Sequence, residues 1–460
     1  MSAERAAKRN FSRKQQVTES FDGEDRPGLA ARQCATRLLG AVIEKHTSLD
    51  GLTDNSNGHP QYMALDDRDR SLVRAILGAA LRNRGAIEAA ISQMIDRPLP
   101  ENAVALKHLL HVAAAQILYL DLPDRAAVDL AVTAANGDPR NRRFASMVNA
   151  VLRRLSREKE TFANRAAVNV PSWFEASLVA AYGKEKAGAI LEIQAKEPAV
   201  DLTVKGDPQV WAERLGGLAL PTGSVRLANI EGALTSLPGF AEGEWWVQDT
   251  AASLPAKLFG DITGKRVADL CAAPGGKTAQ LALAGANVTA LDLSANRLKR
   301  LRANLERLHF TADTVEANLA AYEPAKPFDA VLLDAPCSST GTVRRHPDVP
   351  WTKSPEEIAK LAALQAKLLD HAVTLVRPGG TIVFSNCSLD PSEGETVARQ
   401  LIAKNPAIEL VPVVAEEIGG LADLITKEGF VRSTPADLPN DDAALSGMDG
   451  FFAARFRRKY

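Results

Sequence analysis

The feature that most constrains the fold is the alternation of strands and helices that begins after Gly264. Short apolar runs alternate with helical segments through the C-terminal part of the chain, which predicts a doubly wound parallel sheet in a domain at residues 258–460. In such a sheet the carboxyl ends of the strands meet at one edge, and ligands bind there. We therefore expect functional residues directly after the strands.

A tight glycine turn follows the first of these strands, RVADLCA, and leads into a helix. Gly275 and Gly276 allow the backbone to approach a ligand closely, and the free amide groups at the start of the helix suit a carboxylate. The turn lacks the GxGxxG spacing of a dinucleotide site. A glycine turn by itself is weak evidence, because many strand-to-helix turns need one.

The second strand, NVTALDLS, ends at Asp292. This position is about 20 residues beyond the turn, where an acidic side chain accepts hydrogen bonds from ribose hydroxyls. Asp292 could instead be the N-cap of the next helix, a role that Ser294 fits equally well. We favour the ribose contact, because a glycine turn followed by an acidic strand end indicates a nucleoside-containing cofactor.

Two cysteines follow later strands of the same sheet. Asp334 and Cys337 come directly after FDAVLLD, and Cys387 follows TIVFSN. These residues should converge on one pocket at the sheet edge. A free cysteine is most often a small buried hydrophobe, and we assign that role to Cys34 and Cys271. Two cysteines at polar strand ends favour a chemical role instead.

The part of the chain before the sheet divides into three segments. Residues 1–28 are polar and lack periodicity, so we expect a disordered basic tail. Residues 29–160 carry apolar residues at helical spacing and predict an all-helical domain. Residues 161–257 mix one helix with short strand-like pieces and predict a small linker subdomain.

The last helix of the all-helical domain has a basic outer face. The net charge of the chain is -1, so affinity for a polyanion must come from local clusters. A solvated face on a core helix is the alternative interpretation. We predict that RNA contacts four arginines of this region and two of the loop after Cys337, namely Arg142, Arg143, Arg153, Arg154, Arg344 and Arg345.

Other features indicate a cytoplasmic protein without metal. The four cysteines form no CxxC pair, which favours a reducing compartment. No apolar run reaches the roughly 18 residues of a membrane helix, and the N-terminus lacks a signal-type segment. His108 and His111 have a spacing that suits a metal, but their apolar neighbours favour core histidines. We expect no metal, no membrane association and a monomer.

Several motifs together resemble one enzyme family. The motifs DLCAAPGGKT, LLDAPCSSTGTVRRHPDVPW, NCSLDPSEGE and GMDGFFAARF are similar to those of the RsmB (Sun/Fmu) family of ribosomal RNA 5-methylcytosine methyltransferases. The stretches LYLDLPDRAAVDLAV and FASMVNAVLRRL resemble the helical NusB-like RNA-binding domain. The similarity covers roughly residues 29 to 460. It implies a multidomain chain with an all-α NusB-like domain, a small α+β linker subdomain and an α/β Rossmann-like S-adenosylmethionine methyltransferase domain.

The resemblance also implies roles for site residues. Asp292 would hold the ribose of S-adenosyl-L-methionine, and Asp334 would lie beside the amino-acid end of the cofactor. The chain departs from the family at Asn318, where an Asp is usual; the amide keeps its hydrogen-bonding capacity for the adenine but loses the charge. It also has Asn386 where Thr is frequent. The cofactor would be cradled by Cys271, Ala272, Ala273, Pro274, Gly275, Gly276 and Lys277.

The implied reaction explains the need for two thiols. Carbon 5 of cytosine becomes nucleophilic only after a thiolate adds to carbon 6, and Cys is the side chain most readily made anionic near neutral pH. In the family, the later cysteine attacks, so we assign Cys387 as nucleophile, Cys337 to product release and Asp334 to orienting the cytosine. DNA cytosine methyltransferases instead use the Pro-Cys cysteine. The target must be unpaired or flipped out.

Two other functions remain open at this stage. The chain could be an RNA-binding ribosome-assembly factor whose methyltransferase-like domain is non-catalytic, a reading that Asn318 supports slightly. It could also methylate cytosine 5 of transfer RNA. The NusB-like domain favours small-subunit (16S) ribosomal RNA, and cofactor titration separates an enzyme from a scaffold.

Overall fold

The structure is a computed structural model that describes residues 26–55, 57–163, 167–228, 230 and 232–460. The chain divides into two compact units, of which one comprises Met1–Ala41 and Gly51–Ala167 and the other Val42–Asp50 and Val168–Tyr460. Residues 1–25 of the predicted tail lie outside the described residues. The boundaries predicted near residues 160 and 257 stay predictions.

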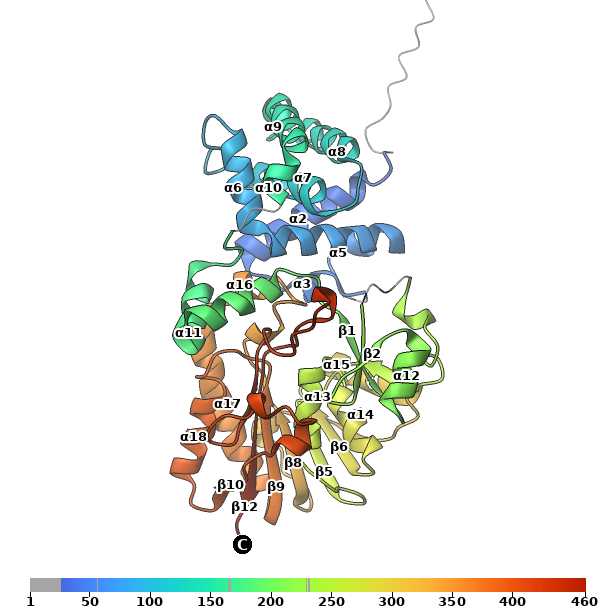
Figure 1. Cartoon of the computed structure of the whole chain (residues 1–460), viewed down its shortest axis with the longest axis vertical. Helices are drawn as coiled ribbons and strands as arrows, with labels where there is room; N and C mark the ends of the chain where they lie inside the picture. The colour runs from blue at the N-terminus through green and yellow to red at the C-terminus, as the bar shows by residue number, and fades with distance from the viewer. Residues whose placement is uncertain (1–25, 56, 164–166, 229, 231) are drawn as a thin grey trace, which may run out of the picture. The chain divides into compact units, whose positions relative to one another are not determined.

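The first unit is helical throughout its described part, which confirms the all-α prediction (Figure 1). Helix α7 is its centre, because α5, α6, α8, α9 and α10 all pack against it and it is buried on every side. The helices are α2 (Leu29–Lys45), α3 (Leu49–Leu52), α4 (Pro60–Met63), α5 (Asp67–Arg82), α6 (Arg84–Met94), α7 (Val104–Tyr119), α8 (Asp124–Gly137), η1 (Arg142–Phe144), α9 (Ala145–Arg157) and α10 (Lys159–Ala163). The end of α2 from Val42 and the start of α3 up to Asp50 belong to the second unit.

The longer segment of the second unit starts at Val168 and first forms a helix and a small antiparallel sheet. Helix α11 (Ser172–Gln194) contains a break at Gly183, whose φ is 78°. The sheet has the order β2-β3-β1-β4, and α12 (Pro208–Leu215) shares a hydrophobic core with it. Its strands are β1 (Val200–Val204), β2 (Leu218–Ala219), β3 (Ser224–Leu227) and β4 (Trp245–Val247). The predicted α+β subdomain is therefore present.

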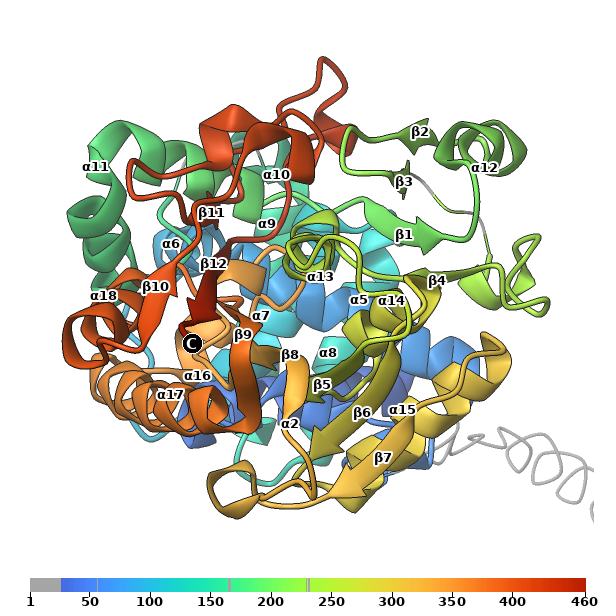
Figure 2. The ribbon, with the colours of Figure 1, turned by 90° about the horizontal axis from the view of Figure 1, so that it is seen from below.

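The larger sheet has the order β10-β12-β9-β8-β5-β6-β7, with β11 beside β12 (Figure 2). Its strands are β5 (Arg266–Leu270), β6 (Asn287–Asp292), β7 (Asp313–Glu316), β8 (Phe328–Asp334), β9 (Val376–Asn386), β10 (Ile408–Leu410), β11 (Val431–Ser433) and β12 (Phe451–Arg458). Strands β7, β6, β5, β8 and β9 pair in parallel, as predicted. Strand β12 pairs antiparallel with β9, so the sheet is mixed, a common arrangement at the edge of parallel sheets.

Helices cover both faces of this sheet, because successive side chains of each strand point to opposite sides. Leu332 and Val383 pack toward α13 (Thr250–Lys257) and α14 (Gly276–Leu283). Leu333 and Phe384, the next residues along, pack toward the opposite face. Helix α15 (Ala295–Arg307) packs on β6, and α17 (Pro355–Leu375) and α18 (Glu395–Lys404) join the core of Phe384. The short helix α16 (Val349–Thr352) precedes α17.

The helices of the described chain are all too short or too polar to cross a membrane.

Replacing Phe384 with Ala should lower the free energy of unfolding by about 3–5 kcal/mol, because a fully buried ring is lost and a cavity remains. Phe384 is 0% exposed and its ring centroid lies 5.9 Å from that of Phe452. Leu364 on α17 is 41% exposed, and Leu364→Ala should change stability by less than about 0.5 kcal/mol. Urea unfolding of both variants measures the difference; equal losses would contradict the packing described.

Candidate active site

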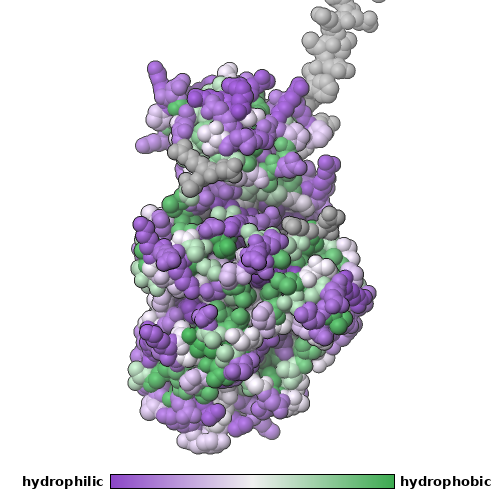
Figure 3. All heavy atoms as spheres, viewed as in Figure 1, coloured by the Kyte–Doolittle hydropathy of each residue, from purple (hydrophilic) through white to green (hydrophobic). Residues whose placement is uncertain are grey.

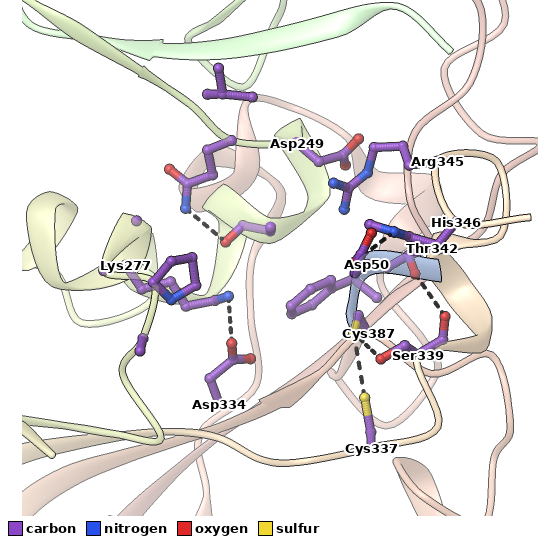
Figure 4. Close-up of a pocket in the computed structure, with 18 of the residues that line it drawn as sticks. Asp50, Asp249, Lys277, Asp334, Cys337, Ser339, Thr342, Arg345, His346 and Cys387 are labelled. Atoms are coloured by element: carbon purple, nitrogen blue, oxygen red, sulfur yellow. Dashed lines mark hydrogen bonds and ion pairs between the residues drawn. The ribbon is translucent and has the colours of Figure 1, made fainter. Parts of the chain in front are cut away.

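The carboxyl ends of β5, β8 and β9 surround a cavity of about 750 Å³ in the second unit (Figure 4). The backbone of the glycine turn lines one side. Asp334, Cys337 and Cys387 line another. The structure therefore brings the two cysteines and the turn together, although they are separated by up to 115 positions or so in sequence.

The glycine turn has the backbone geometry that its sequence predicts. Gly275 has φ 103° and forms the N-cap of α14, where a side chain would be strained. A Cβ atom at this position would also lie 3.0 Å from Leu301. Cys271 has φ 64°, a conformation uncommon for a residue other than glycine. The turn is therefore held in a tight conformation beside the cavity.

Of the first two cysteines of the chain, Cys34 is buried and Cys271 is partly buried, and both thiols are protonated near neutral pH. Burial raises the pKa of Cys271 to about 12 and that of Cys34 to about 11. Cys34 is 1% exposed within the first unit.

Asp292 lies behind the turn and is 2% exposed. Its Oδ2 accepts a hydrogen bond from the Ala273 amide at 3.2 Å, and its Oδ1 accepts one from the Ser294 amide at 3.0 Å. Arg297 forms an ion pair with the same carboxylate at 3.2 Å. The side chain of Ser294 caps α15, so the N-cap role belongs to Ser294. The ribose contact of Asp292 stays a prediction.

Asn318 does not line the cavity in this structure. It is exposed, and its Oδ1 accepts a hydrogen bond from the Ala320 amide at 3.1 Å, which caps the short helix η3 (Leu319–Ala321). The contact with adenine therefore remains a prediction without support from the described geometry.

Asp269 is a cavity residue that the sequence reasoning missed. It lies on β5, is 0% exposed, and its Oδ2 accepts a hydrogen bond from Thr278 Oγ1 at 2.6 Å. Its Oδ1 has no hydrogen-bond partner. Burial raises the pKa of Asp269 to about 7. An acidic residue among the apolar residues of the buried part of strand RVADL was the signal that could have identified it.

Asp334 is held from both sides. Its Oδ2 pairs with Lys277 Nζ at 2.8 Å, and its Oδ1 accepts a hydrogen bond from Ser385 Oγ at 2.9 Å. Lys277 Nζ also lies 4.8 Å from the centroid of the Phe451 ring. A carboxylate fixed in this way has one defined orientation toward the cavity.

The thiols of Cys337 and Cys387 are 3.4 Å apart, and Cys387 Sγ lies 3.6 Å from Ser339 Oγ. The hydrogen bond between the two thiols lowers the pKa of Cys387, with help from Ser339 and Lys277 against the opposing effect of burial. The same hydrogen bond, together with burial, raises the pKa of Cys337 well above its ordinary value. The two thiols are therefore unequal, and Cys387 ionises more readily than Cys337.

The two arginines predicted to contact RNA after Cys337 differ in their surroundings. Arg344 is 1% exposed and pairs with Asp249 and Asp449. The prediction that Arg344 contacts RNA is therefore wrong, because its guanidinium is buried in ion pairs within the protein. Arg345 also pairs with Asp449, but it lines the cavity and its side chain is 36% exposed. Only Arg345 is placed to meet a ligand there.

The basic helix α9 of the first unit presents its arginines outward. Val148, Val151, Leu152 and Leu155 form the buried face. The four arginines predicted to contact RNA are all exposed, namely Arg142, Arg143, Arg153 and Arg154. Figure 3 shows a mainly hydrophilic surface over the part of the first unit where Figure 1 labels α8 and α9. The exposed face is therefore polar and basic.

The two histidines considered for a metal are buried in the first unit, each 4% exposed. Burial lowers the pKa of His111 to about 3, so its imidazole is neutral. Within the described ranges, no three His, Cys, Asp or Glu side chains gather as a metal would need.

The residues present fit S-adenosyl-L-methionine. Its amino-acid end carries an ammonium group, and the buried Asp269 Oδ1 beside the cavity lacks a partner that such a group would supply. Its carboxylate suits the amide groups at the start of α14. The turn from Ala272 to Lys277 lines the same cavity.

A parallel sheet with a glycine turn after β5, an acidic end to β6 and a cavity at the carboxyl edge defines an S-adenosylmethionine-dependent methyltransferase. The sequence matches the 16S rRNA methyltransferase RsmB/F family over residues 261–457 and the NusB family over residues 29–157. Ribosomal RNA small subunit methyltransferase B of Xanthomonas campestris pv. campestris is 39% identical over 413 residues, which cover 85% of this chain and 91% of that protein. The chain belongs to the RsmB/F family.

A second relative supports this assignment, and two solved structures share the fold. The protein of the same name from Pseudomonas putida is 34% identical and covers 92% of this chain and 97% of its own length. The crystal structure of PH0851 shares the fold, with a TM-score of 0.68 at 21% identity over 94% of this chain and 98% of that chain. A methyltransferase homolog from Pyrococcus horikoshii has a TM-score of 0.51 at 27% identity over 62% of this chain and 93% of that chain.

Asp269→Asn should change how stability depends on pH. The folded pKa of Asp269 is about 7, above the 3.8 of an unperturbed Asp, so the folded state holds a proton that the unfolded state releases between these values. The unfolding free energy of the parent minus that of the variant should fall as pH rises through this window and be constant above it. Urea unfolding of the ligand-free proteins at a series of pH values measures this difference, and a pH-independent difference would contradict the raised pKa.

Proposed function

We propose that this chain methylates carbon 5 of an unpaired cytosine in small-subunit (16S) ribosomal RNA through a covalent adduct to Cys387. The observation that carries the proposal is the pair of thiols 3.4 Å apart at the edge of the cofactor cavity, beside Asp334. The printed names of the relatives, ribosomal RNA small subunit methyltransferase B, support the choice of substrate.

Cys387 is the nucleophile in this mechanism. Its thiolate adds to carbon 6 of the cytosine, and the electron pair that leaves the 5,6 double bond makes carbon 5 nucleophilic. The lowered pKa of Cys387 favours ionisation of this thiol over that of Cys337. S-adenosyl-L-methionine, when bound, supplies the methyl group as an electrophile.

Asp334 and Lys277 orient the base. The Asp334 side chain is 29% exposed, and Lys277 and Ser385 fix its two oxygens. A carboxylate held in this way can accept a hydrogen bond from the amino group of cytosine, which places carbon 6 over Cys387.

Cys337 assists product release. Solvent water takes the proton from carbon 5, the electron pair of that bond re-forms the 5,6 double bond, and the bond between Cys387 and carbon 6 breaks so that the sulfur leaves as a thiolate. The thiol of Cys337, whose sulfur lies 3.4 Å from that of Cys387, can then donate a hydrogen bond to the leaving thiolate. The high pKa of Cys337 keeps it protonated and therefore able to donate.

The two cysteine variants should differ in a diagnostic way. Cys337→Ala can still form the adduct but loses the donor that helps Cys387 to leave, so a covalent protein–RNA complex should accumulate. Cys387→Ala has no thiolate to add and should form neither adduct nor product, while still binding RNA and cofactor. The double variant should behave like Cys387→Ala. A denaturing gel with labelled RNA and added cofactor measures the complex.

Two outcomes would contradict this assignment. A covalent band with Cys387→Ala but not with Cys337→Ala would reverse the roles of the two cysteines. Full activity in both variants would exclude the covalent mechanism.

The exposed arginines of η1 and α9 are proposed to bind RNA phosphates, and Arg345 to meet RNA at the cavity. The arginines of α9 lie on the side opposite the buried stripe, which leaves their charges at the surface. Arginine pairs with phosphate through several N–H groups at once.

Replacing Arg142, Arg143, Arg153 and Arg154 with Glu should weaken RNA binding and reduce its dependence on salt by roughly one unit of logarithmic slope per lost phosphate contact. Affinity for S-adenosylmethionine should stay unchanged. A control with equal charge reversal uses four other exposed arginines of the first unit, Arg37, Arg68, Arg97 and Arg125. Filter binding at several salt concentrations measures both variants. Equal losses in the two would show a general charge effect and contradict the assigned surface.

A further inference from the structure

Six polar side chains are buried directly behind the two cysteines. Each is at most 2% exposed: Ser338, Thr340, Gln365, Asn386, Ser388 and Glu393. Ser338 follows Cys337 in sequence, and Asn386 and Ser388 flank Cys387. Burying polar groups is unfavourable unless each is hydrogen-bonded, so a cluster of this kind at one place needs a reason.

The carboxylate of Glu393 accepts several hydrogen bonds from residues near Cys337. Its Oε1 accepts hydrogen bonds from the Ser338 amide at 2.9 Å and from Gln365 Nε2 at 2.8 Å. Its Oε2 accepts a hydrogen bond from Ser338 Oγ. A carboxylate suits this position because it accepts from several donors at once and needs to donate to none.

Gln365 connects the Glu393 carboxylate to Asn386, the residue before Cys387. Its Oε1 accepts a hydrogen bond from Asn386 Nδ2 at 3.1 Å, and the same Nδ2 donates to the backbone oxygen of Glu393 at 2.8 Å. Asn386 Oδ1 accepts from the Ser388 amide at 3.0 Å. An unbroken chain of hydrogen bonds therefore runs from the residue after Cys337, through α17, to the residue before Cys387.

We propose that Glu393 and Gln365 are positioning residues that set the distance between the sulfurs of Cys337 and Cys387. Neither side chain lines the cavity, so they act through the two cysteine-bearing loops. This inference rests on the proposed function, in which both thiols act on the same cytosine. Such a reaction is sensitive to geometry, since a misplacement of about 1 Å can reduce a rate about 100-fold.

Three variants separate positioning from charge. Glu393→Gln keeps an oxygen for the Ser338 amide and Gln365, and its amide can donate to Ser338 Oγ instead of accepting from it. Glu393→Ala leaves those donors without an acceptor. Gln365→Leu interrupts the chain with an apolar side chain of similar size.

The affinity for phenylarsine oxide reports whether the two sulfurs are close enough to bind one atom, because its trivalent arsenic binds two neighbouring thiols together. The full-length protein is titrated without RNA or cofactor. Glu393→Gln should bind within about threefold of the parent, whereas Glu393→Ala and Gln365→Leu should bind roughly tenfold or more weakly, because the sulfurs separate. Cys337→Ala gives the value for one thiol.

Activity provides the second readout. Glu393→Ala and Gln365→Leu should lower kcat for RNA methylation by roughly tenfold or more, with KM for RNA within about threefold of the parent. Glu417 offers a matched control, because it is a partly buried carboxylate that pairs with Arg455 and contacts neither cysteine loop. Glu417→Ala should leave arsenical affinity and kcat unchanged.

The outcomes distinguish the inference from the proposed function. Parental arsenical affinity in Gln365→Leu and Glu393→Ala would overturn the positioning role, and so would a loss in Glu393→Gln as large as in Glu393→Ala. If Glu393→Ala does not fold, the comparison of arsenical affinity between Gln365→Leu and Glu393→Gln decides whether the two residues position the thiols. A parent protein that shows the expected arsenical pattern but methylates no cytosine would uphold the positioning and overturn the proposed function.

Discussion

The parallel pairing of β5, β8 and β9 is the constraint on which the active site depends. Its register places Leu270 beside Leu333 and Asp334 beside Ser385, so the chain leaves the sheet at one edge after each strand. Cys337 and Cys387 follow those exits within a few residues. Because backbone hydrogen bonds fix the register, the approach of the two thiols is set by the sheet before any side chain of the site acts.

Buried charges then hold the loops that leave this edge. Arg344 pairs with Asp249 at the start of α13 and with Asp449 before β12, and Arg345 shares Asp449. A buried ion pair is costly to form and more costly to break, since removing one partner leaves an uncompensated charge. The loop after Cys337 is therefore tied to two other segments of the unit. The same ion pairs explain why a basic Arg-Arg motif contributes only one residue to the cavity.

The asymmetry of the thiols follows from the same confinement. Two thiols held 3.4 Å apart in a partly enclosed site share their protons unequally, because one sulfur donates and the other accepts. Ser339 and Lys277 add to the stabilisation of the Cys387 thiolate. The hydrogen bond with Cys387 and, after it, burial raise the pKa of Cys337 and keep this thiol protonated. The division of labour proposed for the two cysteines thus has a physical origin in their surroundings.

The sequence by itself determined the helical first unit and the parallel strands, because periodicity is a local property. It also predicted that Cys337, Cys387 and the glycine turn converge, because the carboxyl ends of parallel strands meet at one edge of a sheet. Only the tertiary structure decided which polar residues face inward. It placed Arg344 in ion pairs, Asn318 on a surface cap and Asp269 beside the cavity. It also gave Glu393 its donors, which lie 28 and 55 positions away in sequence. Burial and long-range partners depend on how distant segments pack, and no local pattern encodes that packing.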